Sequence, residues 1–307
     1  MPSIKVRVPA TIANLGPGFD SLGLAVSLFL DVEGSPAEVD GFEYYGDGVV
    51  PETGNLVHTG YYAAGRAMNL TLPHLKVVSK SAIPLARGLG SSSAALVAGA
   101  VLADELSGHR LGRHGVLRVC AEIEGHPDNV APAVLGGFTA SCMSERGPIS
   151  LALPFPSGWK LLVATPDSEL LTRNARAVLA EEVTRDQAIF NVSRAAVWVA
   201  AVATGRFDAL AEASRDALHQ DARASLIPGL VAAIEAAMSA GAGAAFLSGA
   251  GPSVAAVVQA GREVAVQEAL SAYAPRVLRL HIAGGYTARA GATNAADSAL
   301  PLDGAPS

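Results

Sequence analysis

Hydrophobic and polar positions recur with regular spacing over most of the chain, and this pattern predicts its secondary structure. Residues 4–8 alternate apolar and charged side chains, which is typical of a half-buried strand. Further strands are expected at 22–32, 38–45, 75–79, 159–164, 244–248, 254–259 and 276–283. Helices are expected at 55–69, from the serines at 91–93 to residue 106, and at 113–124, 174–182, 186–203, 207–221, 229–240 and 263–273. Asn55 is the expected cap of the helix at 55–69.

The order of these elements indicates two domains, in line with a typical domain size of roughly 150 residues. The best candidate for a junction is 147–158, which contains three prolines. In the second half, a helix, a hairpin, a helix and a strand fit helices packed on one face of an antiparallel sheet, an α+β arrangement. We therefore expect domains at 1–156 and 157–286, followed by a flexible tail at 287–307, where alanine, glycine, proline and aspartate dominate.

Composition narrows the classes of function. Half of the 307 residues are hydrophobic and 16% are charged, which indicates a compact globular protein. A net charge of -6 without a basic cluster gives no support for nucleic-acid binding, and no apolar run is suited to crossing a membrane. Because the two cysteines form no CxxC pair and the N-terminus does not resemble a signal sequence, we expect a cytoplasmic protein.

A glycine-rich stretch at 84–95 is the first candidate for chemistry. It reads Pro-Leu-Ala-Arg-Gly-Leu-Gly-Ser-Ser-Ser-Ala-Ala and leads into a nearly all-apolar helix. Gly88 and Gly90 permit a close approach to the main chain, and one of the three serines is expected to cap the helix. The positive end of such a helix can bind a phosphate. The same residues also fit a loop that only turns the chain and caps the helix.

Several families of glycine-rich loop are excluded by the sequence. A P-loop requires Gly-Lys, which does not occur, and the His-Arg-Asp and Asp-Phe-Gly motifs of protein kinases are absent. The sequence contains no Gly-x-Ser-x-Gly motif, so a serine hydrolase is not supported. A dinucleotide fingerprint would need a third glycine where Ser93 stands and an acidic residue about 20 positions later.

Two further clusters of polar residues surround turns. Asn14 and Asp20 flank a Gly-Pro-Gly turn, and 125–129 reads Gly-His-Pro-Asp-Asn. One of the two carboxylates just before the second cluster, Glu122 or Glu124, could hold a divalent cation. Both clusters also fit ordinary turn chemistry, since Asn and Asp bond their own backbone, and the glutamates also fit a solvated helix face.

Taken together, these segments resemble motifs of the GHMP kinase superfamily, which includes galactokinase, homoserine kinase and mevalonate kinase. Residues 9–23 resemble the first motif of homoserine kinases, 84–95 the phosphate loop of the superfamily, and 248–253 its third, glycine-rich motif. Residues 124–132 narrow the resemblance to homoserine kinases. The motifs stand in the family's order, and the resemblance covers residues 4 to 283.

The resemblance implies a two-domain α+β GHMP kinase fold, in which the N-terminal domain contains a left-handed βαβ unit and the C-terminal domain is ferredoxin-like. It implies phosphorylation of the L-homoserine hydroxyl by ATP with Mg²⁺, giving O-phospho-L-homoserine for threonine biosynthesis, and a homodimer. Two alternatives stay open at this point. One is a related GHMP kinase acting on another hydroxy amino acid or alcohol, and the other is a nucleotide-binding sensor without catalysis.

The resemblance also assigns roles to residues of this chain. ATP binding falls to Asn55, Leu56, Pro84, Leu85, Ala86, Arg87, Gly88, Leu89, Gly90, Ser91, Ser92, Ser93, Ala94, Gly249 and Gly251. Ser92 and Glu124 would hold Mg²⁺. Substrate binding falls to Asn14, Asp20, His126, Asp128, Asn129, Thr172, Arg176 and Arg223, among which Asp20, Asp128, Asn129 and Arg176 are expected to act in catalysis.

The zwitterionic substrate explains the charged members of this set. The two aspartates suit its ammonium group, and the forked donors of Arg176 and Arg223 suit its carboxylate. Asn129 stands where mevalonate kinase-like members carry an aspartate, and an amide cannot accept a proton. We therefore expect the hydroxyl proton to pass to the phosphate, while Asp20 and Asp128 bind the substrate.

Overall fold

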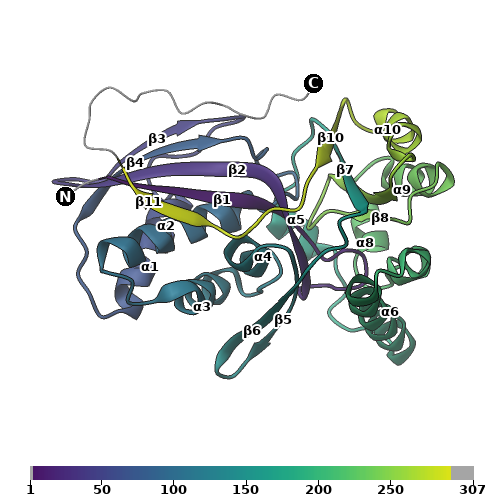
Figure 1. Cartoon of the computed structure of the whole chain (residues 1–307), viewed down its shortest axis with the longest axis horizontal. Helices are drawn as coiled ribbons and strands as arrows, with labels where there is room; N and C mark the ends of the chain where they lie inside the picture. The colour runs from purple at the N-terminus through teal and green to yellow at the C-terminus, as the bar shows by residue number, and fades with distance from the viewer. Residues whose placement is uncertain (1–2, 292–307) are drawn as a thin grey trace.

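The computed structural model describes residues 3–291 and contains two β-sheets, each with its own helices (Figure 1). The first sheet has seven strands, in which β11-β1-β2-β4-β3 are neighbours and the hairpin β5–β6 is joined to β2. Its strands are β1 (Ile4–Ala13), β2 (Leu22–Ala37), β3 (Gly41–Tyr45), β4 (His74–Ser81), β5 (Phe138–Ser144), β6 (Gly147–Leu153) and β11 (Thr287–Ala290).

Four helices cover one face of this sheet (Figure 1). They are α1 (Leu56–Ala67), α2 (Ser91–Leu106), α3 (Gly112–Glu124) and α4 (Val130–Leu135). The side chains of α2 are mostly small and apolar on all of its faces, so the helix is buried between the sheet and the neighbouring helices. The strands β3 and β4 are parallel and are connected through α1, which makes a βαβ unit. As predicted, Asn55 caps α1 by accepting a hydrogen bond from the His58 amide.

The second sheet has four antiparallel strands in the order β10-β7-β9-β8. These are β7 (Trp159–Thr165), β8 (Ala244–Leu247), β9 (Val254–Gln259) and β10 (Arg276–Leu280). The helices are α5 (Thr172–Ala177), α6 (Arg185–Thr204), η1 (Phe207–Ala209), α7 (Leu210–Ala213), α8 (Gln220–Ala224), α9 (Leu230–Ser239) and α10 (Glu263–Ser271). Helices, a hairpin, a helix and a strand follow β7, and this strand order confirms the ferredoxin-like prediction.

Two predictions about the middle of the chain are wrong, one of them in part. The first residues of the expected junction at 147–158 form strand β6, which pairs with β5 from Phe138↔Leu153 to Ser144↔Gly147, and only 154–158 connects the two sheets. Pro148 is tolerated there because β6 pairs only with β5, and an edge strand can lack one amide donor. The helix expected at 207–221 is interrupted, and η1, α7 and α8 occupy this region as separate short helices.

The flexible tail expected at 287–307 is also wrong in its first residues. Thr287–Ala290 forms β11, which pairs antiparallel with β1 from Ile4↔Ala290 to Arg7↔Thr287. The chain thus returns to the first sheet after completing the second. The local composition gave no sign of this strand because the open edge of β1 supplies its partners. The rest of the expected tail, 292–307, lies outside the described residues.

A group of aromatic side chains connects the two sheets. Trp198 of α6 is fully buried, with its ring centroid 6.0 Å from that of Phe138 on β5 and 6.1 Å from that of Phe246 on β8. All three residues belong to one large hydrophobic core that spans both sheets. Within residues 3–291, no helix is long and apolar enough to cross a membrane.

We predict that Trp198→Ala lowers the free energy of unfolding by about 3–5 kcal/mol, because it empties a buried site between the sheets. Urea unfolding followed by circular dichroism measures this loss. Val192→Ala is the matched control, since Val192 lies on the same helix with 71% of its surface exposed. Its effect should stay within about 0.5 kcal/mol. Equal losses in the two variants would contradict the role of Trp198.

Candidate active site

A cavity of about 230 Å³ lies between the domains and collects residues from distant parts of the chain. All eight predicted substrate-binding residues line it, as do seven residues predicted to bind ATP. The latter are Ala86, Gly88, Leu89, Gly90, Ser91, Ser92 and Gly249. A cleft between domains that gathers several convergent polar groups is a common place for a small-molecule site.

The glycine-rich loop leads directly into α2 at one wall of this cavity. Gly88 and Gly90 have φ angles of 72° and 70°, which favour glycine. A Cβ on Gly88 would clash with the Ser248 carbonyl, and one on Gly90 would clash with the Thr11 hydroxyl. The predicted serine cap is wrong, because left-handed Gly90 takes the cap position and no side chain caps α2. The first-turn amides of α2 are therefore left for a ligand.

A second glycine-containing turn packs against this loop. The Ser248 hydroxyl donates to the Gly88 carbonyl at 2.6 Å, and the Gly249 amide donates to the Ala13 carbonyl at 3.2 Å. The Gly249 carbonyl in turn accepts a hydrogen bond from Asn14 Nδ2 at 3.0 Å. The three motifs, separated widely in sequence, thus meet at one point.

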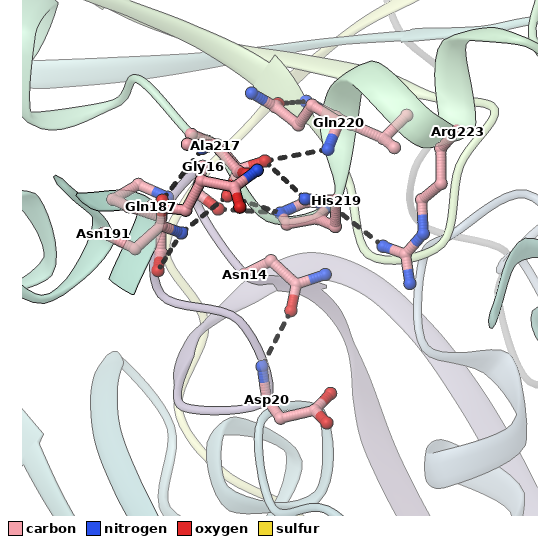
Figure 2. Close-up of polar contacts among 12 residues, drawn as sticks. Asn14, Gly16, Asp20, Gln187, Asn191, Ala217, His219, Gln220 and Arg223 are labelled. Carbon is pink, nitrogen blue, oxygen red and sulfur yellow. Dashed lines mark hydrogen bonds and ion pairs between the residues drawn. The ribbon is translucent and has the colours of Figure 1, made fainter. Parts of the chain in front are cut away.

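The loop from Asn14 to Asp20 has an unusual backbone, with positive φ angles at Asn14 (71°), Leu15 (48°) and Asp20 (56°). Asn14 Oδ1 accepts a hydrogen bond from the Asp20 amide at 3.1 Å, which closes the loop (Figure 2). Two carbonyls of the loop accept hydrogen bonds from the C-terminal domain. His219 Nε2 lies 2.8 Å from Gly16 O, and Asn191 Nδ2 donates to Pro17 O at 3.1 Å.

Asp20 and Arg176 form a two-pronged ion pair in the cavity. Arg176 Nη2 donates to Asp20 Oδ1 at 2.6 Å, and Nη1 donates to Oδ2 at 3.1 Å. Burial lowers the pKa of Arg176, but the hydrogen bonds and charge of Asp20 outweigh burial and raise it overall. Both side chains remain about one-third exposed, so a charged ligand can reach either.

Arg223 is different, because it is buried and bonds only neutral acceptors. Its Nε donates to Ala175 O at 3.2 Å, and its Nη1 lies 3.0 Å from Gly249 O and 3.1 Å from His219 Nδ1. Burial and the nearby Arg176 charge lower its pKa to about 10. Among residues 3–291, no carboxylate forms an ion pair with Arg223. Its cationic head is therefore suited to an anionic ligand.

The turn after α3 brings its polar groups together. His126 Nδ1 lies 2.6 Å from Asp128 Oδ1, which also accepts from Asn129 Nδ2 at 3.2 Å. The Thr11 hydroxyl donates to Asn129 Oδ1 at 2.7 Å. Burial lowers the pKa of His126, and the hydrogen bond and charge of Asp128 more than offset it, so that the pKa is raised.

The two glutamates near this turn have different surroundings. Glu124 lies at the cavity wall with 12% of its side chain exposed, and its partial burial raises its pKa against the opposing effects of His126 and the Ser92 hydroxyl. Glu122 is on the surface, where its carboxylate accepts a hydrogen bond from Arg118 Nε at 2.8 Å. Of these two candidates for a cation ligand, only Glu124 lines the cavity. Asp20, His126 and Asp128 form a second group of potential metal ligands, whose ligand atoms lie within 4.8 Å of one another. In this group, Asp20 is already bonded to Arg176.

The other predicted ATP-binding residues do not line this cavity. Asn55 Oδ1 accepts from the His58 amide at 3.0 Å and its Nδ2 donates to Glu52 O at 2.7 Å, so its side chain is occupied in capping α1. Arg87 donates to the carbonyls of Pro166 and Asp167 beside a neighbouring pocket. The remainder, Leu56, Pro84, Leu85, Ser93, Ala94 and Gly251, also lie outside the lining.

Sequence analysis assigned no role to Phe19 and His219, which pack beside this site, or to the lining residues Leu170, Leu171 and Ala250. The guanidinium carbons of Arg176 and Arg223 each lie 5.4 Å from the centroid of the Phe19 ring, and the His219 ring lies 5.3 Å from it. His219 precedes Arg223 by four residues, the spacing that places two side chains on one helix face. This signal was hidden because the helix expected at 207–221 ended before Arg223.

Comparison with known proteins agrees with this arrangement. Residues 55–137 match the model of the GHMP kinases N terminal domain, and 198–276 match that of the GHMP kinases C terminal domain. The chain is 54% identical over 285 residues to a homoserine kinase of Thermus thermophilus, covering 92% of this chain and 97% of the relative. It is 45% identical over 214 residues to the homoserine kinase of Deinococcus radiodurans, covering 69% and 70% of the two chains.

Solved structures share the fold. The crystal structure of homoserine kinase from Cytophaga hutchinsonii superposes with a TM-score of 0.82 at 27% identity, covering 94% of this chain and 98% of that one. Mevalonate kinase from L. major gives a TM-score of 0.69 at 15% identity, covering 91% and 96%, which shows the fold alone. The matched domain models and the relatives of nearly full length lead to one conclusion: the chain belongs to the homoserine kinase family of the GHMP kinases.

Proposed function

We propose that this chain transfers the γ-phosphoryl group of ATP to the side-chain hydroxyl of L-homoserine. The observation that carries this proposal is the charge layout of one cavity. One wall offers the start of α2, which no side chain caps. The other offers Arg223, a buried cation that forms no ion pair with a carboxylate of residues 3–291, near Asp20. Phosphates suit the first wall, and a zwitterionic amino acid suits the second.

The phosphate-binding part would rely on backbone groups. Residues 88–92 line the cavity, and the left-handed glycines would let phosphate oxygens approach their amides closely. No Gly-Lys is present, so no lysine of the P-loop type contributes. Donors held in place by the backbone need no reorganisation when charge develops on the phosphate.

The amino-acid part would use both domains. Arg223 and Arg176 bind the carboxylate of homoserine, while Asp20 and Asp128 bind its ammonium group. Asp20 and Arg176 already contact a group of opposite charge, namely each other, and the substrate would replace that partner for each of them. Asn14, His126, Asn129 and Thr172 supply polar contacts around the rest of the substrate.

Ser92 and Glu124 would hold Mg²⁺. A hydroxyl and a carboxylate beside the phosphate loop are the hard oxygen donors that this ion prefers. When bound, Mg²⁺ neutralises charge on the phosphates. Burial raises the pKa of Glu124, and His126 and the Ser92 hydroxyl oppose this effect by favouring the carboxylate.

The transfer step itself requires positioning more than covalent help. The homoserine oxygen attacks the γ-phosphorus, the bond from that phosphorus to the bridging oxygen of ADP breaks, and the hydroxyl proton passes to the transferred phosphate. Asp128 is engaged by His126, and Asn129 has no basic oxygen, so these groups hold the substrate in this scheme.

We also propose that the protein acts in the cytoplasm as a homodimer. Its two cysteines, Cys120 and Cys142, are both free thiols, which suits a reducing compartment. The homodimer rests on the family resemblance.

We predict that the purified protein releases ADP from ATP-Mg²⁺ fastest with L-homoserine in a panel that also contains mevalonate, galactose and shikimate. Among these acceptors, homoserine combines the hydroxyl with the ammonium and carboxylate groups that the cavity matches. A coupled assay of ADP release measures the rates. A higher kcat/KM with any other member of the panel would overturn the assignment of homoserine.

We predict that Glu124→Gln lowers kcat by about 10²–10³-fold, because the metal loses its charged ligand next to the phosphates. Steady-state rates over a titration of Mg²⁺ measure this loss. Glu122→Gln is the matched control, and since Glu122 is on the surface, its kinetics should remain those of the unmodified enzyme. A larger effect from Glu122→Gln would exchange the roles of the two glutamates.

We predict that Asp128→Asn raises the KM for homoserine by about tenfold, with a smaller change in kcat, because a charged contact to the ammonium group is lost. Initial rates at saturating ATP separate the two constants. If turnover instead fell by several orders of magnitude while homoserine affinity stayed intact, Asp128 would be the general base, and direct proton transfer to the phosphate would be wrong.

A further inference from the structure

His219 joins the Asn14–Asp20 loop to Arg223 through its two ring nitrogens. Nε2 lies 2.8 Å from the Gly16 carbonyl and Nδ1 lies 3.1 Å from Arg223 Nη1 (Figure 2). The ring is fully buried and rests against Phe19. It therefore contacts a substrate loop on one side and a substrate-binding residue on the other, without lining the cavity itself.

The partners fix which nitrogen carries the hydrogen. An arginine can only donate, so Nδ1 must be the acceptor, and a carbonyl can only accept, so Nε2 must carry the hydrogen. The ring is then neutral. Burial has the largest effect and lowers the pKa of His219, in agreement with this state. Asp216 opposes burial, Arg223 lowers the pKa further, and the Gly16 carbonyl and Asp20 raise it by smaller amounts.

A buried network holds the ring in place. Asp216 Oδ2 accepts hydrogen bonds from the amides of His219 and Gln220, both at 2.8 Å. Asp216 Oδ1 accepts from Asn191 Nδ2 at 2.7 Å, and Asn191 Oδ1 accepts from the Ala217 amide at 2.8 Å. These contacts anchor the turn before α8 to the long helix α6 (Figure 2).

The consequence for Arg223 is a fixed orientation. Its Nε donates to Ala175 O, and its Nη1 donates to both Gly249 O and His219 Nδ1. Among residues 3–291, Nη2 has no hydrogen-bond partner, and Figure 2 shows it on the side away from α8. Because Arg223 lines the cavity, Nη2 is the part of its fork that remains for a ligand.

We propose that His219 is a positioning residue for carboxylate recognition: its Nδ1 accepts from Arg223 and thereby directs Nη2 toward the substrate carboxylate. This inference rests on the proposed function, since it names which part of the amino acid His219 serves. Phe19 assists from the side, because its ring lies against both the His219 ring and the Arg223 guanidinium.

Two substitutions separate the two bonds of the ring. In His219→Gln, the amide nitrogen can reproduce the Nε2 contact to Gly16 but leaves Arg223 without its acceptor. In His219→Asn, the shorter amide can reproduce the Nδ1 acceptor but loses the contact to Gly16. His114→Gln, at an exposed position on α3, is the matched control.

Each variant is assayed with L-homoserine and with 3-aminopropan-1-ol, which has the same hydroxyl and amine but no carboxylate. Where its turnover is too slow to follow, its inhibition constant against homoserine replaces kcat/KM. We expect His219→Gln to lower kcat/KM for homoserine roughly 10- to 100-fold, the range for a lost hydrogen bond to a charged group. The kcat/KM (or inhibition constant) for 3-aminopropan-1-ol and the KM for ATP should each change by less than about twofold. His219→Asn should restore most of the homoserine activity.

Two results would overturn the inference. A parallel loss with both substrates in His219→Gln would mean that the ring only supports the fold. A selective loss for homoserine that is equally large in His219→Asn would mean that the Nδ1 acceptor is not its cause. If the unmodified enzyme itself fails to prefer homoserine to 3-aminopropan-1-ol, the proposed function fails first, and that result is seen before any variant is made.

Discussion

The seating of the Asn14–Asp20 loop between the two domains is the constraint on which the site depends. Three of its residues have positive φ angles without being glycine, and such conformations cost about 1–3 kcal/mol each unless the surroundings enforce them. The surroundings here are hydrogen bonds to the C-terminal domain, through Gly249, His219 and Asn191. The position of Asp20 therefore depends on the C-terminal domain, although Asp20 lies in the connection between β1 and β2 of the first sheet.

The charged side chains of the cavity are held in place at some cost to the stability of the folded protein. A buried guanidinium with only neutral partners is unfavourable in the folded protein alone, and the depressed pKa of Arg223 reflects that. A bound carboxylate would recover part of this cost. The Asp20–Arg176 pair has the opposite character, because it is already satisfied and partly exposed. The site thus contains one cation that needs a ligand and one ion pair that a ligand must rearrange.

Sequence reasoning predicted the features that are local. The cap at Asn55, the apolar helix α2 and the order of helix, hairpin, helix and strand in the second half all follow from short patterns. The motifs at 9–23, 84–95 and 124–132 also predicted many of the residues that meet in the cavity, because they matched one family, although eight residues expected to bind ATP lie outside its lining. The resemblance supplied their roles.

What could not be predicted depends on long-range contacts. Strand β11 exists because β1 has an open edge, and β6 tolerates Pro148 because it lies at an edge. The cap of α2 is Gly90 and not a serine, since the loop must turn at that residue beside Thr11. Likewise, the unpaired state of Arg223 depends on Ala175, Gly249 and His219, which lie in three separate segments.

The two domains therefore divide the work in a way that makes their contact part of the chemistry. In the proposed reaction, the loop at 88–90 and the start of α2 would provide the phosphate donors, and the C-terminal domain would provide Arg176 and Arg223. The distance between the attacking oxygen and phosphorus would then depend on how the domains meet, at the Asn14–Asp20 loop and at Trp198. Since a misplacement of about 1 Å can cost 10²-fold in rate, our proposal gives His219 an influence on turnover although it does not line the cavity.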